Sequence, residues 1–427
     1  MKSKIGRRRF LKTAVAAASF TIVKPKSVFG TPANSTIRLG MIGCGNRGSS
    51  VASSFMENTD TRVVAIAELF ENRLVAGKER FNKLCRRKGF PEIKDSHLFL
   101  GSKGYMRLLE SDDVDAVLIA TPTFLHSEQL VAAVEAGKHV YCEKPVSVDV
   151  YGCRRVMFAG KKADGRLSIA IGLQIRHATP FVEMVRRIHN GAIGDIVMGQ
   201  AHYLAGFLKR PIIPDASPDE MRIRNFYYHR ELCGSIILDQ GIHVIDICNW
   251  ILRSHPVKAT GIGGRKGRDD SGNVWSYFMV NFEYPDNIPV SFQETQFDPG
   301  YGDVCERFFG TKGISESHYT GGVFIRGENE WDSGVARGTR EEINKKDWAA
   351  GTFKSALEDA DSNKEKAFID SIKSGNYINE AYQGAESTLS VILGRTAAYK
   401  GEEVTWDEIL SSNEKWDSMI DLSQFDK

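Results

Sequence analysis

The chain of 427 residues is long enough for two domains, and its hydrophobic share of 42% and charged share of 26% are typical of a soluble globular protein. The net charge of +2 is unevenly distributed, because residues 1–30 carry eight basic side chains and no acidic one, which leaves 48 basic against 54 acidic residues in the rest of the chain. That mildly acidic remainder contains no basic stripe or block, so we expect no nucleic-acid partner.

The first thirty residues have the layout of an export signal. Their basic cluster includes Arg7-Arg8-Arg9, which is followed by Phe10-Leu11-Lys12 and an apolar run over residues 14–23. The run is shorter than the roughly 20 residues that span a bilayer, which favours the apolar core of a signal peptide. Paired arginines before Phe-Leu-Lys resemble the twin-arginine signal, which directs the export of folded proteins. We predict a signal peptide over residues 1–30, an encounter with the export machinery, and a periplasmic protein without a stable membrane span; the alternative is a basic N-terminus with a chance apolar stretch.

The seven cysteines, at positions 44, 85, 142, 153, 233, 248 and 305, show neither a CxxC pair nor metal-type spacing. Their odd number argues against a disulfide framework. We therefore expect buried free thiols that behave as small hydrophobic side chains.

Residues 37–172 alternate between short apolar runs and helical patterns. We predict strands over residues 37–42, 62–67, 115–120, 138–142 and 167–172, separated by helices over residues 49–58, 71–87, 127–136 and 148–163. Strands that alternate with helices of this length indicate parallel βαβ units in a doubly wound sheet. The sequence thus predicts an α/β domain over residues 31–175.

The pattern changes after about residue 175. A helix over residues 181–189 is followed by strands over residues 196–204, 257–261, 275–284 and 290–296 without alternating helices, which predicts a mostly antiparallel sheet. Residues 219–255 are mostly helical, residues 364–374 and 386–399 form amphipathic helices, and residues 297–360 give no clear element. Residues 261–264, Gly-Ile-Gly-Gly, precede a polar segment and are predicted to form a loop. We assign residues 176–427 to a second, α+β domain with C-terminal helices.

A glycine-rich turn joins the first predicted strand to the first helix. It consists of Gly43, Cys44, Gly45, Asn46, Arg47 and Gly48. In this GxGxxG pattern the first glycine permits a tight turn, the second lets the backbone approach a pyrophosphate, and the third lets helix and strand pack closely. The N–H groups at the start of the helix then face the anion. The turn therefore predicts dinucleotide binding in a Rossmann-type domain; the alternative is an ordinary turn.

An acidic residue at the end of the second strand bears on which dinucleotide is bound. Glu68 follows the glycine-rich turn by about 20 residues, where a carboxylate accepts hydrogen bonds from ribose hydroxyls and repels a 2′-phosphate. This favours NAD over NADP. Arg73 is close enough to complicate the preference, for example by stacking on the adenine.

Polar motifs follow the third and fourth strands. Residues 121–126 read Thr-Pro-Thr-Phe-Leu-His, and Glu143-Lys144-Pro145 comes directly after the fourth strand. Because open α/β sheets bind ligands outside the carboxyl ends of their strands, we expect Lys144 at the nicotinamide side of the crevice. Far downstream, Asp239 and His243 are four residues apart in a helical stretch and share one helix face. That pair is suited to act as a base and the residue that orients it.

These motifs together resemble the glucose–fructose oxidoreductase and inositol dehydrogenase family. The resemblance rests on GCGNRG, on the TPxxxH of residues 121–126, on the EKP of residues 143–145 and on the DxxxH of residues 239–243. It implies a nucleotide domain followed by a substrate domain with an open-faced sheet that often mediates homo-oligomers, so we expect a dimer or tetramer. Residues 223–234, IRNFYYHRELCG, resemble an exported branch that acts on sugars and glycosides.

The resemblance also implies residue roles. The expected cofactor contacts are Gly43, Gly45, Asn46, Arg47, Gly48, Glu68, Arg73, Thr121, Pro122, His126, Glu143, Lys144 and Gln174. In the oxidation of a secondary alcohol, His243 would accept the hydroxyl proton and Asp239 would orient its imidazole. Lys144 would bind the reacting oxygen and stabilise its developing charge.

Structural alternatives exist for these residues. Asp246 and Trp250 continue the face of Asp239 and His243, so that face could be a packing seam. A metal bound by Asp239, His243 and Asp246 lacks a further converging His or Cys, so we predict no metal there. Expected sugar contacts are Arg176 together with the cluster Arg222, Arg224, Asn225, Tyr227, Tyr228 and His229, although a solvated loop or an oligomer contact explains the cluster equally well.

The sequence therefore predicts an NAD-dependent dehydrogenase acting on a ring hydroxyl of a sugar or glycoside. One alternative is a redox-neutral glycosidase or lyase that works through a transient keto-glycoside, and another is a non-catalytic protein that binds carbohydrate or NAD. Free dinucleotide is scarce outside the cytoplasm. An exported enzyme is therefore expected to carry its NAD tightly bound.

Overall fold

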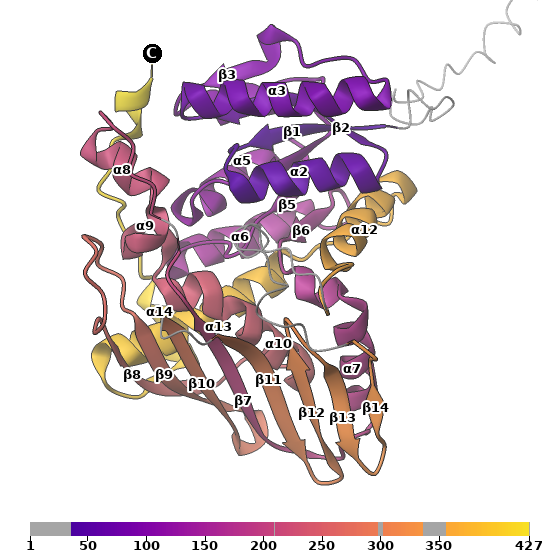
Figure 1. Ribbon diagram of the computed structural model, residues 1–427, viewed down its shortest axis with the longest axis vertical. Helices are drawn as coiled ribbons and strands as arrows, with labels where there is room; N and C mark the ends of the chain where they lie inside the picture. The colour runs from indigo at the N-terminus through magenta and orange to yellow at the C-terminus, as the bar shows by residue number, and fades with distance from the viewer. Residues whose placement is uncertain (1–35, 209, 298–301, 336–355, 427) are drawn as a thin grey trace, which may run out of the picture. The chain divides into compact units, whose positions relative to one another are not determined.

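Six parallel strands form the first sheet, in the order β3-β2-β1-β4-β5-β6 (Figure 1). The structure is a computed structural model that describes residues 36–208, 210–297, 302–335 and 356–426. The predicted signal peptide lies outside these residues. The strands are β1 (Ile37–Ile42), β2 (Thr61–Glu68), β3 (Leu98–Leu100), β4 (Ala116–Ile119), β5 (His139–Cys142) and β6 (Ile169–Ile171). The doubly wound parallel sheet predicted from the sequence is confirmed.

Helices cover both faces of this sheet. One face packs against α2 (Asn46–Asn58), α3 (Glu71–Lys88) and α12 (Ala360–Ser374), and the other against α4 (Gly104–Leu109), α5 (His126–Glu135) and α6 (Val150–Ala163). Each face has its own apolar core, because both sides of every central strand are hydrophobic. Neither β3 nor α4 was predicted. Three half-buried residues at a sheet edge and a six-residue helix are too short to show a period.

The second sheet has nine strands, in the order β14-β13-β12-β11-β7-β10-β9-β8-β15. All neighbours are antiparallel except β7 and β10, which run parallel, so the sheet is mixed but mostly antiparallel, as predicted. The strands are β7 (Ile196–Ala205), β8 (Lys258–Gly264), β9 (Tyr277–Tyr284), β10 (Ile288–Gln296), β11 (Asp303–Gly310), β12 (Gly313–His318), β13 (Val323–Gly327), β14 (Trp331–Asp332) and β15 (Val404–Thr405).

Two parts of the second sheet differ from the sequence prediction. Residues 261–264 were predicted to form a loop but belong to β8, and the ring of Trp275 fills the space that a side chain at Gly263 would need. The glycines thus accommodate a neighbouring ring. The stretch 297–360, which gave no clear element, contains β11, β12, β13 and β14, because their alternating pattern is diluted by glycines and buried polar side chains.

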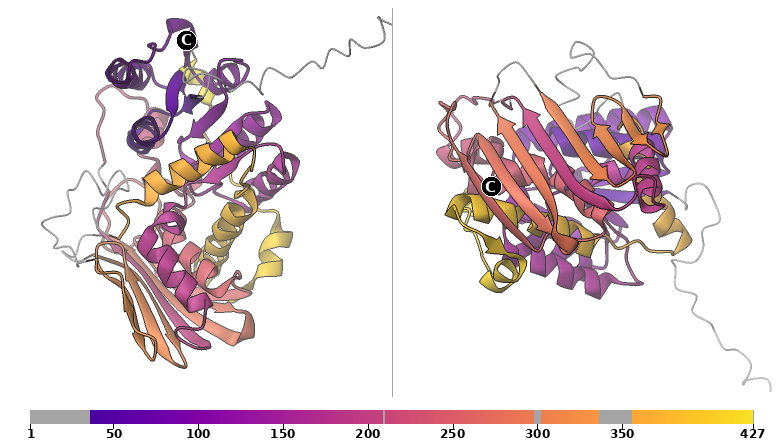
Figure 2. Two further views of the ribbon diagram at one scale, coloured as in Figure 1. Left: turned by 90° about the vertical axis from the view of Figure 1, so that its right-hand side faces the viewer. Right: turned by 90° about the horizontal axis from the view of Figure 1, so that it is seen from below.

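Helices cover one face of the second sheet (Figure 2). They are α7 (Thr179–His189), α10 (Ile242–Leu252) and α13 (Ala381–Lys400), the last of which packs between α6 and strands β8 and β9. Along β7 the residues that face these helices, such as Ala201 and Tyr203, are buried, while their neighbours are partly exposed. No helix in the described part of the chain covers the opposite face. The remaining helices are α8 (Pro218–Arg224), α9 (Arg230–Cys233) and α14 (Trp406–Ser412).

The placement of the cysteines agrees with the sequence prediction, and hydropathy singles out one apolar helix. All seven cysteines are buried with free thiols. One helical stretch, Arg230–Leu252, is long and apolar enough to cross a membrane by length and composition, but 83% of its apolar window is buried inside the protein. It therefore has the character of a core helix.

Candidate active site

A cavity of about 950 Å³ opens where the carboxyl ends of β1, β2, β4 and β5 face the helices of the second sheet. It is lined by most of the residues that the sequence singles out, namely Gly43, Gly45, Asn46, Arg47, Glu68, Arg73, Thr121, Pro122, His126, Glu143, Lys144, Gln174, Arg224, Asn225, Tyr227, Asp239 and His243. The cavity is large enough for a dinucleotide and a small substrate together.

The three glycines of the glycine-rich turn have three different environments. Gly43 has φ of +91°, and a Cβ added there would lie 2.9 Å from the carbonyl oxygen of Ala120. At Gly48 a Cβ would lie 2.7 Å from the carbonyl oxygen of Gly43, so this glycine allows α2 to pack on β1. A Cβ at Gly45 would meet nothing within 4 Å. Gly45 therefore faces open space beside the first N–H groups of α2, where a pyrophosphate fits.

Glu68 is fixed at the end of β2 by backbone donors. Its Oε2 accepts a hydrogen bond from the Cys44 N–H at 2.7 Å, and its Oε1 accepts from the Leu69 N–H at 2.8 Å and the Phe70 N–H at 3.1 Å. The carboxylate thus stands next to the glycine-rich turn, in the position for ribose recognition. The backbone N–H groups fix the Glu68 carboxylate beside the glycine-rich turn, and this arrangement fits NAD(H).

Two arginines and an aromatic ring form the wall beyond Glu68. The guanidinium of Arg224 lies 4.0 Å from the centroid of the Phe70 ring, and that of Arg73 lies 5.9 Å from it. Burial lowers the pKa of Arg73, and the nearby charge of Arg224 lowers it further, against the opposing effect of Glu68. The wall is flat and cationic, which suits stacking on a purine.

Arg47, although part of the glycine-rich turn, is engaged by two carboxylates. Its Nε donates to Glu143 Oε1 at 2.9 Å, and its two terminal nitrogens donate to the carboxylate of Asp361 at 2.8 and 2.9 Å. Burial lowers the pKa of Arg47, but the two carboxylates outweigh burial and leave it well above its ordinary value. This network fastens α12, which is distant in sequence, to the cofactor turn.

His126 connects the two motif loops of the first domain. One ring nitrogen lies 2.7 Å from the carbonyl oxygen of Pro145 and the other 2.7 Å from that of Thr121. Burial lowers the pKa of His126, against the two carbonyl oxygens, which raise it. A neutral His126 has one N–H and can donate to one of these two carbonyls at a time. Its ring thus bridges the loop at residue 121 and the one at residue 145, whose Lys144–Pro145 bond is cis.

Lys144, Asp239 and His243 meet at the opposite end of the cavity. Lys144 Nζ donates to the backbone carbonyl of Asp239 at 2.7 Å and lies 3.8 Å from its Oδ1. Burial raises the pKa of Asp239, and Lys144 opposes that rise. Burial lowers the pKa of His243 well below its ordinary value, and the charges of Lys144 and Arg47 lower it further. His243 is thus a neutral imidazole beside a cation, as a proton acceptor requires.

The predicted contact between Asp239 and His243 is not present. Residues Ile237–Gly241 form a π-helical turn that ends where α10 begins. The turn directs the Asp239 carboxylate toward Lys144, and Nδ1 of His243 is buried without a hydrogen-bond partner among the described residues. A π-turn changes the angle between residues four apart, so the sequence spacing alone misplaced the pair. The ring of Tyr203 stacks on His243 with centroids 6.3 Å apart.

Four of the predicted substrate residues do not line the cavity, namely Arg176, Arg222, Tyr228 and His229. Arg176 forms a two-pronged ion pair with Asp246, with N···O distances of 2.8 and 2.9 Å, and the hydroxyl of Ser387 donates to the same carboxylate at 2.6 Å. Tyr228 is buried and donates to the carbonyl of Leu208. For Arg176 and Tyr228 the reason is the same, because a neighbouring polar group inside the protein already satisfies the side chain. Asp246 belongs to the packing seam that the sequence analysis left open.

Sequence analysis missed several residues at the site. Residues 420–423 line the cavity, the Phe425 ring packs edge-on against Phe70 at 5.4 Å, and the Asp426 carboxylate accepts from Ser102 Oγ at 2.8 Å. Glu294, beneath Asp239, is 1% exposed with neither carboxylate oxygen hydrogen-bonded in the described structure, and burial raises its pKa. An acidic residue on the inward face of a strand is a signal that could have identified Glu294.

Comparison with known proteins decides the family. A model of the oxidoreductase family with an NAD-binding Rossmann fold matches residues 37–171, and a model of the GFO/IDH/MocA C-terminal domain matches residues 181–316. The chain belongs to the GFO/IDH/MocA oxidoreductases. It is an α/β protein of that family, with the NAD-binding domain first, as the sequence resemblance implied.

The relatives include several inositol 2-dehydrogenases and a 1,5-anhydro-D-fructose reductase of Ensifer adhaerens. The chain is 32% identical over 216 residues to a myo-inositol 2-dehydrogenase of Thermotoga maritima, covering 51% of this chain and 55% of that protein. It is 27% identical over 308 residues to inositol 2-dehydrogenase 2 of Saccharopolyspora erythraea, covering 71% of this chain and 80% of that protein. The alignment with the first relative thus spans only about half of that protein's length.

Solved structures share the fold. The aldose-aldose oxidoreductase of Caulobacter crescentus superposes with a TM-score of 0.66 at 19% identity, covering 87% of this chain and 99% of that one. A levoglucosan dehydrogenase in complex with NADH and levoglucosan superposes with a TM-score of 0.65 at 18% identity, covering 87% and 99%. At this identity the likeness concerns the fold.

Proposed function

We propose that the protein oxidises a secondary hydroxyl on the ring of a sugar, glycoside or cyclic polyol and transfers the hydride to NAD. The observation that carries the proposal is the arrangement of one cavity. A dinucleotide cradle lies at one end, and a lysine, a buried carboxyl group and a neutral histidine meet at the other. The inositol dehydrogenases among its relatives and the NADH complex of a structural neighbour support the reaction class.

The chain's own side chains supply the proton chemistry. His243 accepts the proton of the substrate hydroxyl, because its imidazole is neutral and Lys144 and Arg47 disfavour its protonated form before reaction. Lys144 donates a hydrogen bond to the same oxygen as negative charge develops on it. Asp239 holds the lysine, with Oδ1 3.8 Å from Nζ, and so positions the donor rather than the base. NAD, which the turn at Gly45 and the carboxylate of Glu68 would hold, would supply the hydride acceptor.

We also propose that NAD stays bound between turnovers. The support is the segment 413–426, which returns from the second domain to the first and lies against Phe70 and Ser102 beside the cradle. Figure 1 shows the end of the chain beside α8 and near the β3 edge of the first sheet. Such an enclosure would slow the release of NAD, because the segment 413–426 must move away before the adenine end of the cavity opens to solvent. Slow release of NAD would suit a protein that is exported with its cofactor bound. We propose that residues 1–30 are the signal for that export. We also propose that the protein forms a homo-oligomer.

The test is to purify the protein without added NAD and to incubate it with a panel of cyclic polyols, sugars and glycosides. We expect bound dinucleotide, the absorbance of reduced nicotinamide on mixing, and a product that has lost two hydrogen atoms. Release of free aglycone without net cofactor reduction would support the redox-neutral alternative. Bound NAD with no reaction on any substrate would support a binding protein. Absence of any NAD binding would contradict the proposal.

A further inference from the structure

A cluster of metal-ligand side chains lies on the outer face of the second sheet, away from the cavity. In the strand register, Cys305 of β11 is paired with His202 of β7 on one side and with His318 of β12 on the other. Paired residues on neighbouring strands point to the same face, so the three side chains form one row. Asp303 and Glu316 each lie two residues from a member of the row and therefore share its face.

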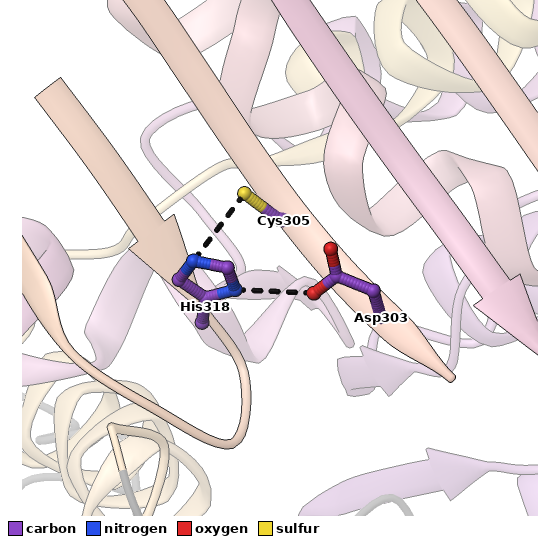
Figure 3. A group of neighbouring side chains, drawn as sticks. All are labelled: Asp303, Cys305 and His318. Carbon is purple, nitrogen blue, oxygen red and sulfur yellow. Dashed lines mark hydrogen bonds and ion pairs between the residues drawn. The ribbon is translucent and has the colours of Figure 1, made fainter. Parts of the chain in front are cut away.

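The distances within the cluster suit coordination. Cys305 Sγ lies 3.8 Å from His318 Nε2 (Figure 3). Bonds of about 2.3 Å to sulfur and about 2.0 Å to nitrogen at a tetrahedral angle separate the two ligand atoms by roughly 3.5 Å. A zinc ion can therefore bridge this pair with a shift of a few tenths of an ångström. Glu316 Oε1 lies 2.6 Å from the same Nε2, while its Oε2 accepts from Arg307 Nε. A rotation of the Glu316 side chain about this pairing would bring Oε1 to the ion as a third ligand.

The other nitrogen of His318 already has an orienting partner. Its Nδ1 lies 3.1 Å from Asp303 Oδ1, and Figure 3 shows the ring held between this carboxylate and the cysteine. A carboxylate that accepts from the remote N–H of a ligand histidine fixes the tautomer and directs the other nitrogen to the metal. Asp303 thus contacts Nδ1 and Cys305 contacts Nε2 of His318, so an ion would bind at Nε2.

Burial and an unsatisfied nitrogen favour a metal over a reactive thiol. Cys305 is 1% exposed and His318 is 7% exposed, and Cys305 does not line the active-site cavity, so a substrate cannot reach the sulfur as a nucleophile would require. His202, the strand partner of Cys305, has a buried Nδ1 with no hydrogen-bond partner in the described structure, which makes it the candidate for a fourth ligand after a side-chain rotation. Cysteine with histidine selects a borderline-soft cation such as Zn²⁺.

We propose that Cys305, His318 and Glu316, with His202 as the fourth ligand and Asp303 as the orienting residue, form a structural Zn²⁺ site that joins β7, β11 and β12. Binding forms a sulfur–metal bond and releases the Cys305 thiol proton to solvent. Because the thiol must lose its proton to bind the ion, the affinity falls as the pH is lowered.

The test uses the full chain, stripped with a chelator and titrated with Zn²⁺, and with Co²⁺ as a spectroscopic probe. We expect one Zn²⁺ per chain, a saturable rise in melting temperature, and a thiolate-to-cobalt charge-transfer band with the d–d absorption of a tetrahedral site. Cys305→Ser should abolish the band. The matched control Cys85→Ser, which removes another buried thiol from α3 in the first domain, should keep it.

A second variant covers the case in which Cys305→Ser fails to fold. Asp303→Asn keeps all the ligands and should weaken Zn²⁺ binding by about 10–100-fold, the usual effect of losing an orienting carboxylate. The proposal fails if the stripped protein takes up no stoichiometric Zn²⁺. It also fails if folded Cys305→Ser binds as the wild type does, or if Cys305 in the native stripped protein is rapidly alkylated at neutral pH as an activated nucleophile.

Discussion

Replacement of His243 by glutamine tests the proton acceptor directly. Glutamine has nearly the volume of histidine and, at a position only 8% exposed, should preserve the packing against Tyr203. It cannot accept a proton at neutral pH. General base catalysis contributes typically ~10²–10⁴-fold, which at ~1.36 kcal/mol per tenfold is about 3–5 kcal/mol of transition-state stabilisation. We expect kcat to fall by that range.

The assay is a single turnover on protein with NAD bound, followed by the absorbance of reduced nicotinamide. Bound NAD should match the wild type, because the cradle at Gly45 and Glu68 is untouched. A variant that reduces its NAD at the wild-type rate would refute the assignment of His243 as the base. A variant that loses NAD or melts early would show that the residue is structural.

The pH profile provides a second measure of the same residue. The pKa of His243 is held well below its ordinary value by burial and by the charges of Lys144 and Arg47. The neutral, active form therefore persists to lower pH. The acid limb of kcat/KM, which reports the pKa of the free enzyme, should have its midpoint below pH ~6.5. An acid limb at or above that pH would mean that His243 is protonated in the resting enzyme.

Five further substitutions test other parts of the structure. Gly45→Ala should weaken NAD binding without lowering the melting temperature, because its Cβ enters open space. Gly43→Ala should lower the melting temperature, because its Cβ meets the backbone of Ala120 and its φ is +91°. Equal melting temperatures of the two variants in calorimetry would contradict this. Arg47→Met leaves the buried carboxylate of Glu143 and the half-buried one of Asp361 without their partner and should cost about 3–5 kcal/mol in the free energy of unfolding. A denaturant midpoint equal to that of the wild type would argue against the network. Phe425→Ala should speed NAD release in a dilution-and-trap experiment, whereas an unchanged rate would show that the segment 413–426 does not retain it. Burial raises the pKa of Glu306 to about 8. Between pH ~4.3 and that value the folded state holds a proton that the unfolded state has lost, so the free energy of unfolding falls as the pH rises. Glu306→Gln should remove this slope in pH-dependent melting, and an identical slope would place the ionisation elsewhere.

The local pattern of the sequence determined the first domain and the cofactor cradle. Strands with hydrophobic side chains on both faces and a GxGxxG turn before a helix are contiguous features, so periodicity and glycine spacing reveal them. Glu68 was found in the same way, because the length of one βα unit fixes its distance from the turn. The NAD-binding fold was therefore predictable before any contact was known.

The reacting end of the cavity depended on tertiary structure. The spacing of Asp239 and His243 predicted a pair, but the π-helical turn and the proximity of Lys144 gave the carboxylate a different partner. Arg176 had the chemistry of a sugar contact until Asp246 neutralised it. Partners far apart in sequence compete for each polar side chain, and the outcome depends on distances that no local pattern contains.

The sequence by itself thus determined the long strands and helices of the first domain and which anion the first helix can hold, because those depend on residues within a few turns of one another. Only the tertiary structure decided which polar groups meet. It brought α12 to Arg47, the segment 413–426 to Phe70, and Cys305 between two histidines. Each of these contacts joins residues far apart along the chain, and the burial that makes them strong exists only in the folded protein.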